Sequence, residues 1–267
     1  FNALPGVRLA GRVPDLAVPG PVVQADVTAA DGMEPVALEA LARGWGVVLA
    51  NKRLLSGPLS TFRNLTATPR LRCEVTVGAG LPWLEMLRHL LDTGDTVLSL
   101  EAAVSGTLGY IFSQLEQGVA FSAAVAQART LGYTEPDPRD DLGAADVRRK
   151  GLILARLLGL PLEWEDLPAA PLYPAEWDAL DIPGFMAALP ALDADYASRV
   201  RTARAEGCVL RYAVQIKEGH ASVGLCPVGA DTPLGRLQGP ACMLALTTAR
   251  YRQHPLVISG PGAGPEV

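Results

Sequence analysis

Lysine and histidine are scarce in this sequence of 267 residues, which has three of each. The histidines, at positions 89, 220 and 254, are too scattered to suggest a zinc site or a Ser-His-Asp arrangement. The other basic residues are all arginines, which keep their proton at working pH, whereas a lysine can release its proton in a suitable environment. Chemistry is therefore expected among the carboxylates and the lysines, which stand at positions 52, 150 and 217.

Cysteine patterns typical of disulfides or metal sites are also missing. The four cysteines are Cys73, Cys208, Cys226 and Cys242, and none of them belongs to a C-x-x-C pair. This spacing predicts free thiols that are mostly buried.

Long apolar runs, basic runs and an N-terminal targeting segment are absent as well. A membrane helix requires about 18 to 20 consecutive apolar residues, and no stretch approaches that length. The net charge is −5 and no run of basic residues occurs, which argues against a nucleic-acid surface. We therefore expect a cytoplasmic protein that binds small molecules and neither membranes nor nucleic acid.

The first third of the chain has the pattern of an α/β fold. Apolar segments at 7–11, 21–28 and 45–51 are typical of strands, and residues 34–44 are typical of an amphipathic helix. Strands that alternate with helices indicate a parallel, doubly wound sheet.

A parallel sheet of this kind binds ligands beyond the carboxyl ends of its strands. In this sequence Asp26, Thr28, Asn51 and Lys52 would lie there. The G-x-G-x-x-G turn that usually holds a dinucleotide is absent. The sequence starts at Phe1 without a methionine, and we expect a further strand and a glycine-rich turn before it.

From residue 72 onward the pattern changes to longer helices and antiparallel strands. Segments that alternate like strands occupy 72–77, 96–104, 210–216, 220–228 and 241–248. Amphipathic helices are predicted over 81–94, 105–118, 121–132 and 196–207.

Charges gather in one segment, GYTEPDPRDDLGAADVRRK, at residues 132–150. Its prolines favour an extended chain, and Asp140 or Asp141 is predicted to cap a helix that continues to about Gly159. Asp146 and Lys150 would then lie one turn apart on one helix face. Taken alone, such a pair is usually a weak surface interaction.

Five motifs together resemble the homoserine dehydrogenase family. They are ANK at 50–52, EVTVGAGLP at 74–82, SGTLGYIF at 105–112, the charged segment at 132–150 and SGPGAG at 259–264. The resemblance implies interconversion of L-homoserine and L-aspartate 4-semialdehyde with NAD or NADP. It also implies an α/β fold with an incomplete Rossmann-like nucleotide-binding domain at 1–73. A homoserine-binding and dimerisation domain of α+β type, with a mostly antiparallel sheet, would follow at 74–254, and residues 255–267 would return to the first domain.

Homoserine carries an ammonium, a carboxylate and a hydroxyl that must lose a proton as hydride leaves the same carbon. A site for it needs anions, hydrogen-bond donors and a proton acceptor. The resemblance implies that Lys150, oriented by Asp146, transfers the proton and that Lys52 is a second lysine at the reaction centre. The implied substrate-binding residues are Glu135 and Asp141 for the ammonium, the amides of Gly106 and Thr107 for the carboxylate, and Tyr133 and Thr134. For Asp137, Arg139, Asp140, Arg148 and Arg149 we expect loop stabilisation and helix capping.

The family resemblance also implies a cofactor site, a cation site and a homodimer that forms through residues 209–249. The implied cofactor-binding residues are Thr28, Asn51, Lys52, Gly260, Gly262 and Gly264. A monovalent cation, Na⁺, would be held in the hinge by the Glu74 side chain and by the backbone carbonyls of Val77, Ala79 and Leu81, all oxygen ligands.

The sequence departs from the family pattern in the charged segment. Where the family often reads D-L-S-G-x-D, residues 141–146 read DLGAAD, and we expect a changed helix start rather than a lost activity. Two alternatives remain open at this point. One is a catalytically inactive relative that binds homoserine or dimerises, and the other is an aspartate-semialdehyde dehydrogenase with Cys73 as its nucleophile.

Overall fold

The computed structural model describes residues 20–262, and the chain forms two compact units that divide between Thr76 and Val77. This division lies close to the boundary predicted after residue 73. The strand predicted at 7–11 and the candidate residue Gly264 lie outside the described residues.

The first unit contains a parallel three-stranded sheet in the order β1-β2-β3. Helix α1 has a proline in its first turn and is followed by Gly44 at φ 79°, a left-handed residue that ends a helix without strain. Ala37 and Ala40 are its buried residues. The parallel α/β prediction is thus confirmed in the described part of this unit. Its elements are β1 (Val23–Asp26), α1 (Glu34–Ala42), β2 (Gly46–Leu49), α2 (Arg53–Ser56), α3 (Leu59–Thr66), β3 (Leu71–Arg72) and the 3₁₀ helix η2 (Glu74–Thr76).

The strand predicted over 72–77 is wrong for most of its length. Only Leu71–Arg72 pairs with β2, and Glu74–Thr76 turns instead into η2. The Thr76 amide and hydroxyl both donate to the Cys73 carbonyl oxygen, at 3.0 and 2.6 Å. A threonine that bonds back to the preceding turn offers the backbone an alternative to the sheet ladder, which explains the difference.

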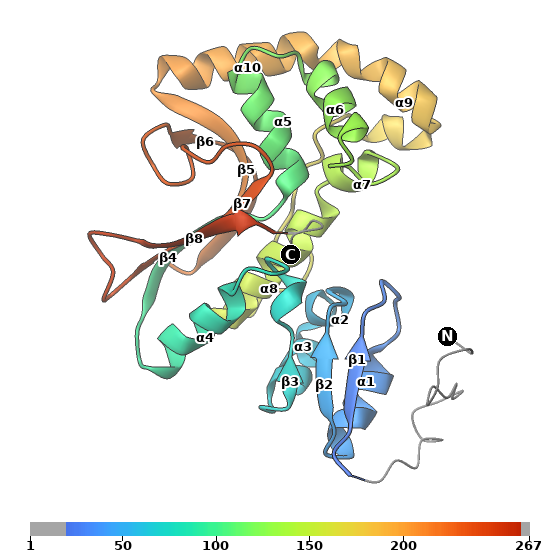
Figure 1. The fold of residues 1–267 in the computed structure, drawn as a ribbon, viewed down its shortest axis with the longest axis vertical. Coiled ribbons are helices and arrows are strands. Elements are labelled where there is room, and N and C mark those ends of the chain that lie inside the picture. Colours follow the sequence, from blue (N-terminus) through green and yellow to red (C-terminus); the bar gives the residue numbers. More distant parts are fainter. Residues whose placement is uncertain (1–19, 263–267) are drawn as a thin grey trace. The chain divides into compact units, whose positions relative to one another are not determined.

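The second unit is built around a five-stranded antiparallel sheet in the order β6-β5-β4-β7-β8 (Figure 1). The predicted antiparallel strands are confirmed, and β5 pairs with β6 over ten residues from Cys208↔Gly229 to Lys217↔His220. The strands are β4 (Val97–Ala103), β5 (Cys208–Lys217), β6 (His220–Gly229), β7 (Ala241–Thr248) and β8 (Leu256–Pro261). The helices are α4 (Trp83–Asp92), α5 (Gly106–Glu116), α6 (Phe121–Thr130), α7 (Arg139–Leu142), α8 (Ala145–Leu157), α9 (Ile182–Ala188) and α10 (Asp193–Ala205), with 3₁₀ helices η3 (Ala175–Ala179) and η4 (Leu189–Leu192).

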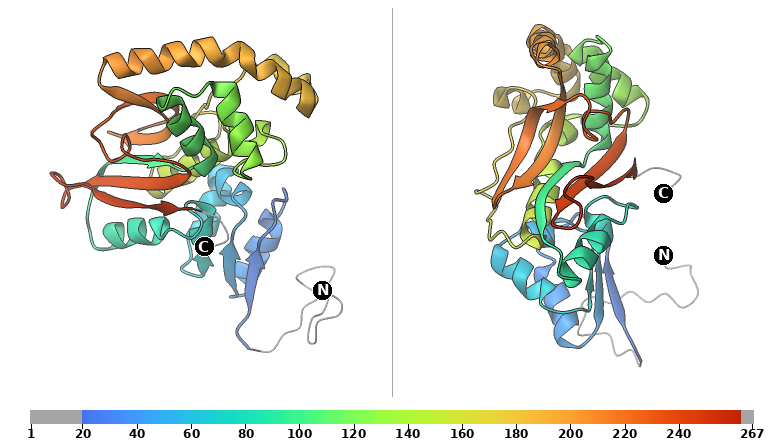
Figure 2. Two further views of the ribbon diagram at one scale, coloured as in Figure 1. Left: turned by 45° about the horizontal axis from the view of Figure 1, so that its top comes forward. Right: turned by 90° about the vertical axis from the view of Figure 1, so that its left-hand side faces the viewer.

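Residues 256–261 belong to the segment predicted to return to the first domain. They form β8, which pairs antiparallel with β7 from Leu256↔Leu246 to Pro261↔Ala241 (Figure 2). The two strands are joined by a short connection, and a hairpin of this kind satisfies the backbone groups of both strands locally.

Both faces of the five-stranded sheet carry apolar side chains. On one face α8 approaches so closely that a Cβ at Gly151 would lie 2.7 Å from a methyl carbon of Val223 and 3.2 Å from one of Val214. On the other face a buried cluster includes two leucines of the β6–β7 loop; its members are Ala103, Ala213, Val228, Leu234, Leu237, Met243 and Ala245. The sheet therefore holds α8 firmly from one side.

Candidate active site

Lys150 is held by two acceptors at the middle of α8. Its ammonium lies 2.8 Å from the Asp146 carboxylate, one turn earlier on the same helix, and donates to the Val104 carbonyl oxygen at 2.7 Å. The Lys150 side chain is 16% exposed, against 42% for Asp146. The structure thus brings these two residues together as predicted, and it adds the carbonyl at the end of β4, for which the sequence gives no signal.

Asp141 connects the charged segment to α5. One carboxylate oxygen accepts from the Thr107 hydroxyl at 2.9 Å, and the other accepts from the Glu135 backbone amide at 2.8 Å. The Thr107 hydroxyl also contacts the Tyr133 carbonyl oxygen. Burial raises the pKa of the Asp141 carboxyl above its usual value, and the nearby charges of Glu135 and Asp146 add to this shift, although the two hydrogen bonds oppose it.

The prediction that Asp140 or Asp141 caps one continuous helix is wrong. Residues Arg139–Leu142 form the single turn α7, and α8 starts separately at Ala145 without a side-chain cap. Between them Ala144 adopts φ 61°, a left-handed conformation that favours glycine. The Asp141 carboxylate accepts from Thr107 and from the Glu135 amide and does not cap α8.

The first turn of α5 is shaped by small residues. The Ser105 hydroxyl accepts from the Leu108 amide at 3.2 Å and so caps the helix. A Cβ at Gly106 would lie 2.6 Å from the Pro240 carbonyl oxygen, so glycine is required here for packing. This close approach sets the position of Thr107 beside Asp141.

Two predicted substrate residues lie on the loop before α7. The Tyr133 ring is 39% exposed and packs against Tyr110, with 5.0 Å between ring centroids. The Thr134 hydroxyl donates to the Glu135 carbonyl oxygen at 2.9 Å. The structure therefore places Tyr133, Thr134 and Glu135 on one loop, next to Asp141.

In the first unit, Asp26 organises the residues predicted to bind the cofactor. Its carboxylate accepts from the Thr28 amide and hydroxyl, at 2.9 and 2.7 Å, and from the Asn51 side-chain amide at 3.1 Å. Asn51 also donates to the Ala30 carbonyl oxygen and accepts from the Arg53 amide. The Asp26 and Asn51 side chains therefore brace the carboxyl ends of β1 and β2. Lys52 follows Asn51 directly, just before α2.

The predicted cation ligands lie in and just after η2. Glu74 opens η2, and Val77, Ala79 and Leu81 belong to the turn that leads to α4. In that turn Gly78 has φ 93° and Ala79 has φ 49°, two successive left-handed residues. A non-glycine residue in this region is uncommon and marks a turn under local strain. Within residues 20–262, no cluster of three or more His, Cys, Asp or Glu side chains is arranged as a metal site.

The glycine segment at the end of β8 packs on this turn within the second unit. The Gly80 amide donates to the Gly262 carbonyl oxygen at 3.2 Å, and a Cβ at Gly260 would lie 3.2 Å from a Leu81 methyl carbon. A Cβ at Gly262 would lie 3.1 Å from the Cys242 sulfur. Burial raises the pKa of the Cys242 thiol above its usual value, so the thiol stays protonated beneath this segment.

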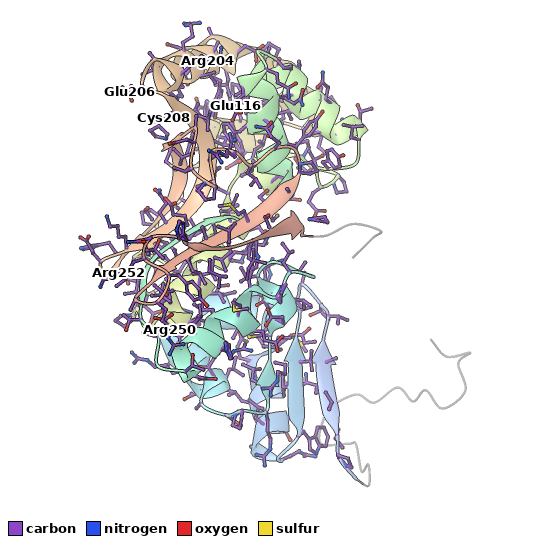
Figure 3. All side chains as sticks on the ribbon, turned by 60° about the vertical axis from the view of Figure 1, so that its left-hand side comes forward. Glu116, Arg204, Glu206, Cys208, Arg250 and Arg252 are labelled. Atoms are coloured by element: carbon purple, nitrogen blue, oxygen red, sulfur yellow. The ribbon has the colours of Figure 1, made fainter. Side chains whose placement is uncertain are left out.

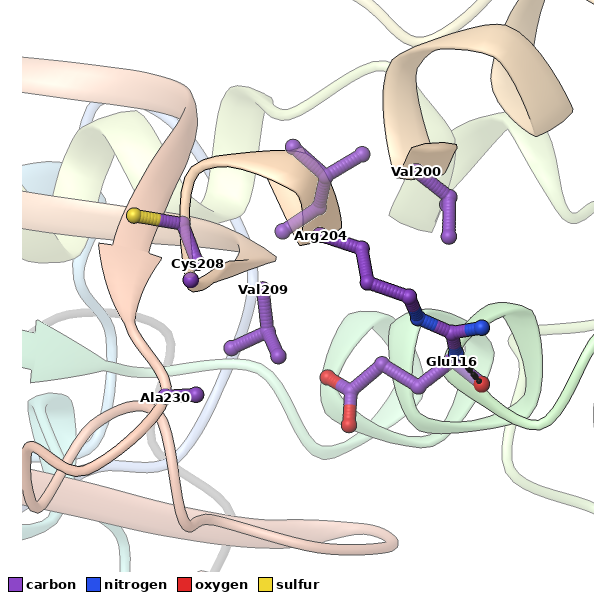
Figure 4. Close-up of a pocket in the computed structure, with 8 residues that line it drawn as sticks. Glu116, Val200, Arg204, Cys208, Val209 and Ala230 are labelled. Carbon is purple, nitrogen blue, oxygen red and sulfur yellow. Dashed lines mark hydrogen bonds between the residues drawn. The ribbon is translucent and has the colours of Figure 1, made fainter. Parts of the chain in front are cut away.

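A cavity of about 270 Å³ lies elsewhere, beside Glu116 at the opposite end of α5 from Thr107. Figure 4 shows residues that line it, and Figure 3 locates Glu116, Arg204 and Cys208 in the molecule. The Arg204 guanidinium donates to the Glu116 carbonyl oxygen beside it, and the Glu116 carboxylate pairs with the buried Arg211. Its lining residues are Glu116, Val200, Arg204, Gly207, Cys208, Val209, Leu210 and Ala230. None of the predicted site residues belongs to this cavity.

Cys73 is 1% exposed and its sulfur is not in a disulfide. A nucleophilic cysteine must reach the substrate and needs a partly exposed, activating environment. The aspartate-semialdehyde dehydrogenase alternative therefore receives no support. Among residues 20–262, no helix has both the length and the apolar character that a bilayer crossing requires.

Comparison with known proteins places the chain in a family. The sequence profile of homoserine dehydrogenase matches residues 82–267. Over 237 residues the chain is 45% identical to bifunctional aspartokinase/homoserine dehydrogenase 2 of Zea mays, and this alignment covers 85% of the chain and 26% of the maize protein. Against the homoserine dehydrogenase of Emericella nidulans the identity is 38% over 245 residues, which covers 85% of the chain and 67% of the fungal protein.

Solved structures share the fold. A Candida auris protein described as having unknown function has a TM-score of 0.85 at 34% identity, over 91% of this chain and 72% of that one. A hyperthermophilic archaeal homoserine dehydrogenase in complex with NADPH has a TM-score of 0.66 at 22% identity, over 91% of this chain and 66% of that one. On the profile match and the fungal relative together, the chain belongs to the homoserine dehydrogenase family.

Proposed function

We propose that the protein catalyses the NAD(P)-dependent interconversion of L-homoserine and L-aspartate 4-semialdehyde. The observation that carries this proposal is the Lys150 ammonium, fixed between Asp146 and the Val104 carbonyl oxygen and close in sequence to a cluster of carboxylates. Family membership supports it. The alignment covers only 26% of the maize relative. The activity is therefore proposed from the residues of this site.

Lys150 is suited to proton transfer at the substrate oxygen. An ammonium has three N–H donors, and two of them are directed to Asp146 and to the Val104 carbonyl. The third is left for the substrate. In the direction of reduction, Lys150 donates a proton to the aldehyde oxygen as hydride reaches the carbon, and a hydroxyl forms. In the direction of oxidation, neutral Lys150 accepts the hydroxyl proton as hydride leaves.

The carboxylates near Lys150 suit the substrate ammonium. Glu135 and Asp146 lie close enough to Asp141 for their charges to raise the pKa of its carboxyl. Of these three carboxylates only Asp146 pairs with Lys150, so the cluster keeps an excess of negative charge, which an ammonium group relieves. The amides of Gly106 and Thr107 lie at the N-terminus of α5, where a carboxylate is favoured.

A nicotinamide cofactor suits the first unit. Thr28, Asn51 and Lys52 lie at the carboxyl ends of β1 and β2, the usual place for a nucleotide on a parallel sheet. The Thr28 and Asn51 side chains both donate to the Asp26 carboxylate, so we assign them to shaping the loop at the cofactor. We assign Lys52 to direct contact on the strength of the family resemblance. On the family resemblance we also assign cofactor contacts to Gly260, Gly262 and Gly264. When bound, the cofactor supplies or accepts the hydride, and the archaeal structure in complex with NADPH supports this class of cofactor.

The cation and the homodimer are part of the same proposal. The left-handed turn at Gly78 and Ala79 suits a site built from the Glu74 carboxylate and the carbonyls of Val77, Ala79 and Leu81, because hard monovalent cations prefer oxygen ligands.

We propose that the homodimer forms through the strands within residues 209–249. Ser222 and Gly224 lie two positions apart on β6 and therefore share one face of the sheet. A face of small, uncharged side chains allows a second copy to approach closely. Sedimentation equilibrium measures this state, and a monomer at micromolar concentration would contradict the assignment.

The initial rate of L-homoserine oxidation tests the main proposal. Reduced nicotinamide is followed by absorbance with NAD⁺ and with NADP⁺ separately, and the expected result is homoserine-dependent turnover with at least one of them. N-acetyl-L-homoserine keeps the hydroxyl and the carboxylate but lacks the ammonium, so it should react poorly if the acidic cluster binds that group. Absence of turnover together with absence of homoserine binding would reject the proposal and favour an inactive relative.

A further inference from the structure

The single turn α7 cannot hold its own position. It has four residues, Arg139–Leu142, and lies between Pro138 and Gly143. One helical turn fixes many dihedral angles for few hydrogen bonds, so it is unstable unless other segments stabilise it. The position of Asp141, and with it the substrate cluster, must therefore be set by contacts outside α7.

Two side chains of α7 make these outside contacts in opposite directions. Residues 139 and 141 are two positions apart, and at 3.6 residues per turn their side chains leave the helix about 200° apart. Asp141 reaches Thr107 and the Glu135 amide on one side. Arg139 reaches the other side, toward residues 172–185, which we call the anchor segment.

The Arg139 guanidinium bonds both its own loop and the anchor segment. Its Nε and Nη2 donate to the Asp137 carboxylate, with Nη2 at 2.6 Å. Its Nη1 donates to the carbonyl oxygens of Asp178 and Leu180, at 3.1 and 2.6 Å. These carbonyls lie at the C-terminal end of η3, where a cation is favoured. The guanidinium also holds the pKa of the Asp137 carboxyl below its usual value, so Asp137 stays charged.

The anchor segment is itself well fixed. The Tyr173 hydroxyl donates to the Asp178 carboxylate at 2.8 Å, and the Phe185 ring is fully buried below Arg139, with the guanidinium carbon 5.6 Å from the ring centroid. The Leu172 amide donates to the Leu142 carbonyl oxygen at 2.9 Å. The anchor segment therefore gives Arg139 a rigid support.

We propose that Arg139 is a positioning residue for the substrate. It fixes α7 on the anchor segment so that Asp141 and Glu135 meet the substrate ammonium, and it does not touch the substrate itself. This inference rests on the proposed homoserine dehydrogenase function. Because it acts on the ammonium contacts and leaves Lys150 in place on α8, its loss weakens homoserine binding more than the chemical step.

Steady-state kinetics of Arg139→Ala test this inference in the wild-type background. We expect the KM for L-homoserine to rise about 10- to 50-fold, the size of one or two lost hydrogen bonds to charged groups. The KM for the nicotinamide cofactor should stay within about twofold, since it depends on other residues. Arg199→Ala is the matched control, because Arg199 pairs with Asp195 on the exposed surface of α10. Its homoserine KM should not change.

One further variant and a chemical rescue separate positioning from general stability. Arg139→Lys keeps the charge beside Asp137 but lacks the fork that bonds the two η3 carbonyls, so an intermediate KM is expected. Millimolar guanidinium chloride should lower the KM of Arg139→Ala and leave that of Arg199→Ala unchanged. A stability role alone would show no such rescue.

The outcomes distinguish this inference from the proposed function. Wild-type protein without homoserine turnover or binding would reject the function itself. Active wild-type protein with an unchanged homoserine KM in Arg139→Ala would reject the positioning role. If Arg139→Ala does not fold, the homoserine KM of Tyr173→Phe tests the positioning role, because this substitution removes only the hydroxyl that holds Asp178. A homoserine KM raised about two- to fivefold supports the role, and an unchanged KM overturns it.

Discussion

The turn α7 and the helix α8 are neighbours in one charged segment, but they are held in place by different means. The Lys150–Asp146 pair of α8 forms between residues one turn apart on a 13-residue helix, and close apolar packing at Gly151 fixes that helix on the sheet. Asp141 and Arg139 of α7 depend on partners from distant segments, namely Thr107 on one side and Asp178 and Leu180 on the other. The proposed proton-transfer group therefore has its carboxylate partner on its own helix, whereas the proposed substrate-binding carboxylate depends on partners from distant segments.

The largest effect is expected on α8. Lys150→Ala should lower kcat about 10²- to 10⁴-fold, because it removes the proposed proton-transfer group. Cofactor affinity, measured by the fluorescence of the reduced nicotinamide, should change little. Lys217→Ala is the matched control, since Lys217 is 71% exposed beside Glu218. A rate of Lys150→Ala within tenfold of wild type would assign proton transfer to Lys52.

On α7, Asp141→Asn should have a smaller effect on activity than Lys150→Ala, and it should increase stability. Loss of the charge should raise the homoserine KM about 10- to 100-fold, with a smaller change in kcat. The asparagine amide can donate to Thr107 while its oxygen accepts from the Glu135 amide, so both contacts of Asp141 are preserved. Because the wild-type carboxyl is destabilised by burial, the variant should have a higher Tm at neutral pH.

The pH dependence of stability follows from the same carboxyl. Its folded pKa lies above the ordinary value of 3.8, so between these two pKa values the folded state binds more protons than the unfolded state. The contribution of Asp141 to the free energy of unfolding therefore decreases as pH rises through this window. Chemical denaturation at several pH values should show that the free energy of unfolding decreases less with rising pH in Asp141→Asn than in the wild type. An identical pH profile in the two proteins would contradict the assigned environment.

Glu135→Gln tests the loop that Asp141 holds. Glu135 is exposed, so its charge is screened by solvent, and we expect the homoserine KM to rise about 3- to 10-fold. Stability should not change, in contrast to Asp141→Asn. An unchanged homoserine KM would show that Glu135 does not contact the substrate ammonium and would leave this contact to Asp141 alone.

The smallest effect is expected at the break between the two elements. Ala144 adopts φ 61° at the position where the family motif often has glycine. Ala144→Gly should increase the free energy of unfolding by about 0.5 to 1 kcal/mol, because glycine adopts this conformation without a steric penalty. Ala145→Gly, placed one residue later inside α8, should decrease stability by a similar amount and is the matched control. Equal effects of both substitutions would show that φ at residue 144 is not strained.

The sequence alone determined the elements that depend on local periodicity and on short-range chemistry. The parallel strands of the first unit, the antiparallel strands of the second and the cap at Ser105 follow from residue patterns within a few positions of each other. The same holds for Asp146 and Lys150, since the helical repeat brings residues four apart into contact. Family resemblance added the roles of these residues, which no spacing alone could supply.

Tertiary structure decided the features that depend on partners far away in the chain. The helix predicted from residue 140 onward is broken at Gly143 and Ala144, because Asp141 bonds Thr107 and Arg139 bonds the anchor segment. Residues 256–261 pair with β7, although their sequence is equally compatible with a strand in the other unit. The Val104 carbonyl that holds Lys150 could not be predicted, since every residue has such a group and only the folded chain selects one.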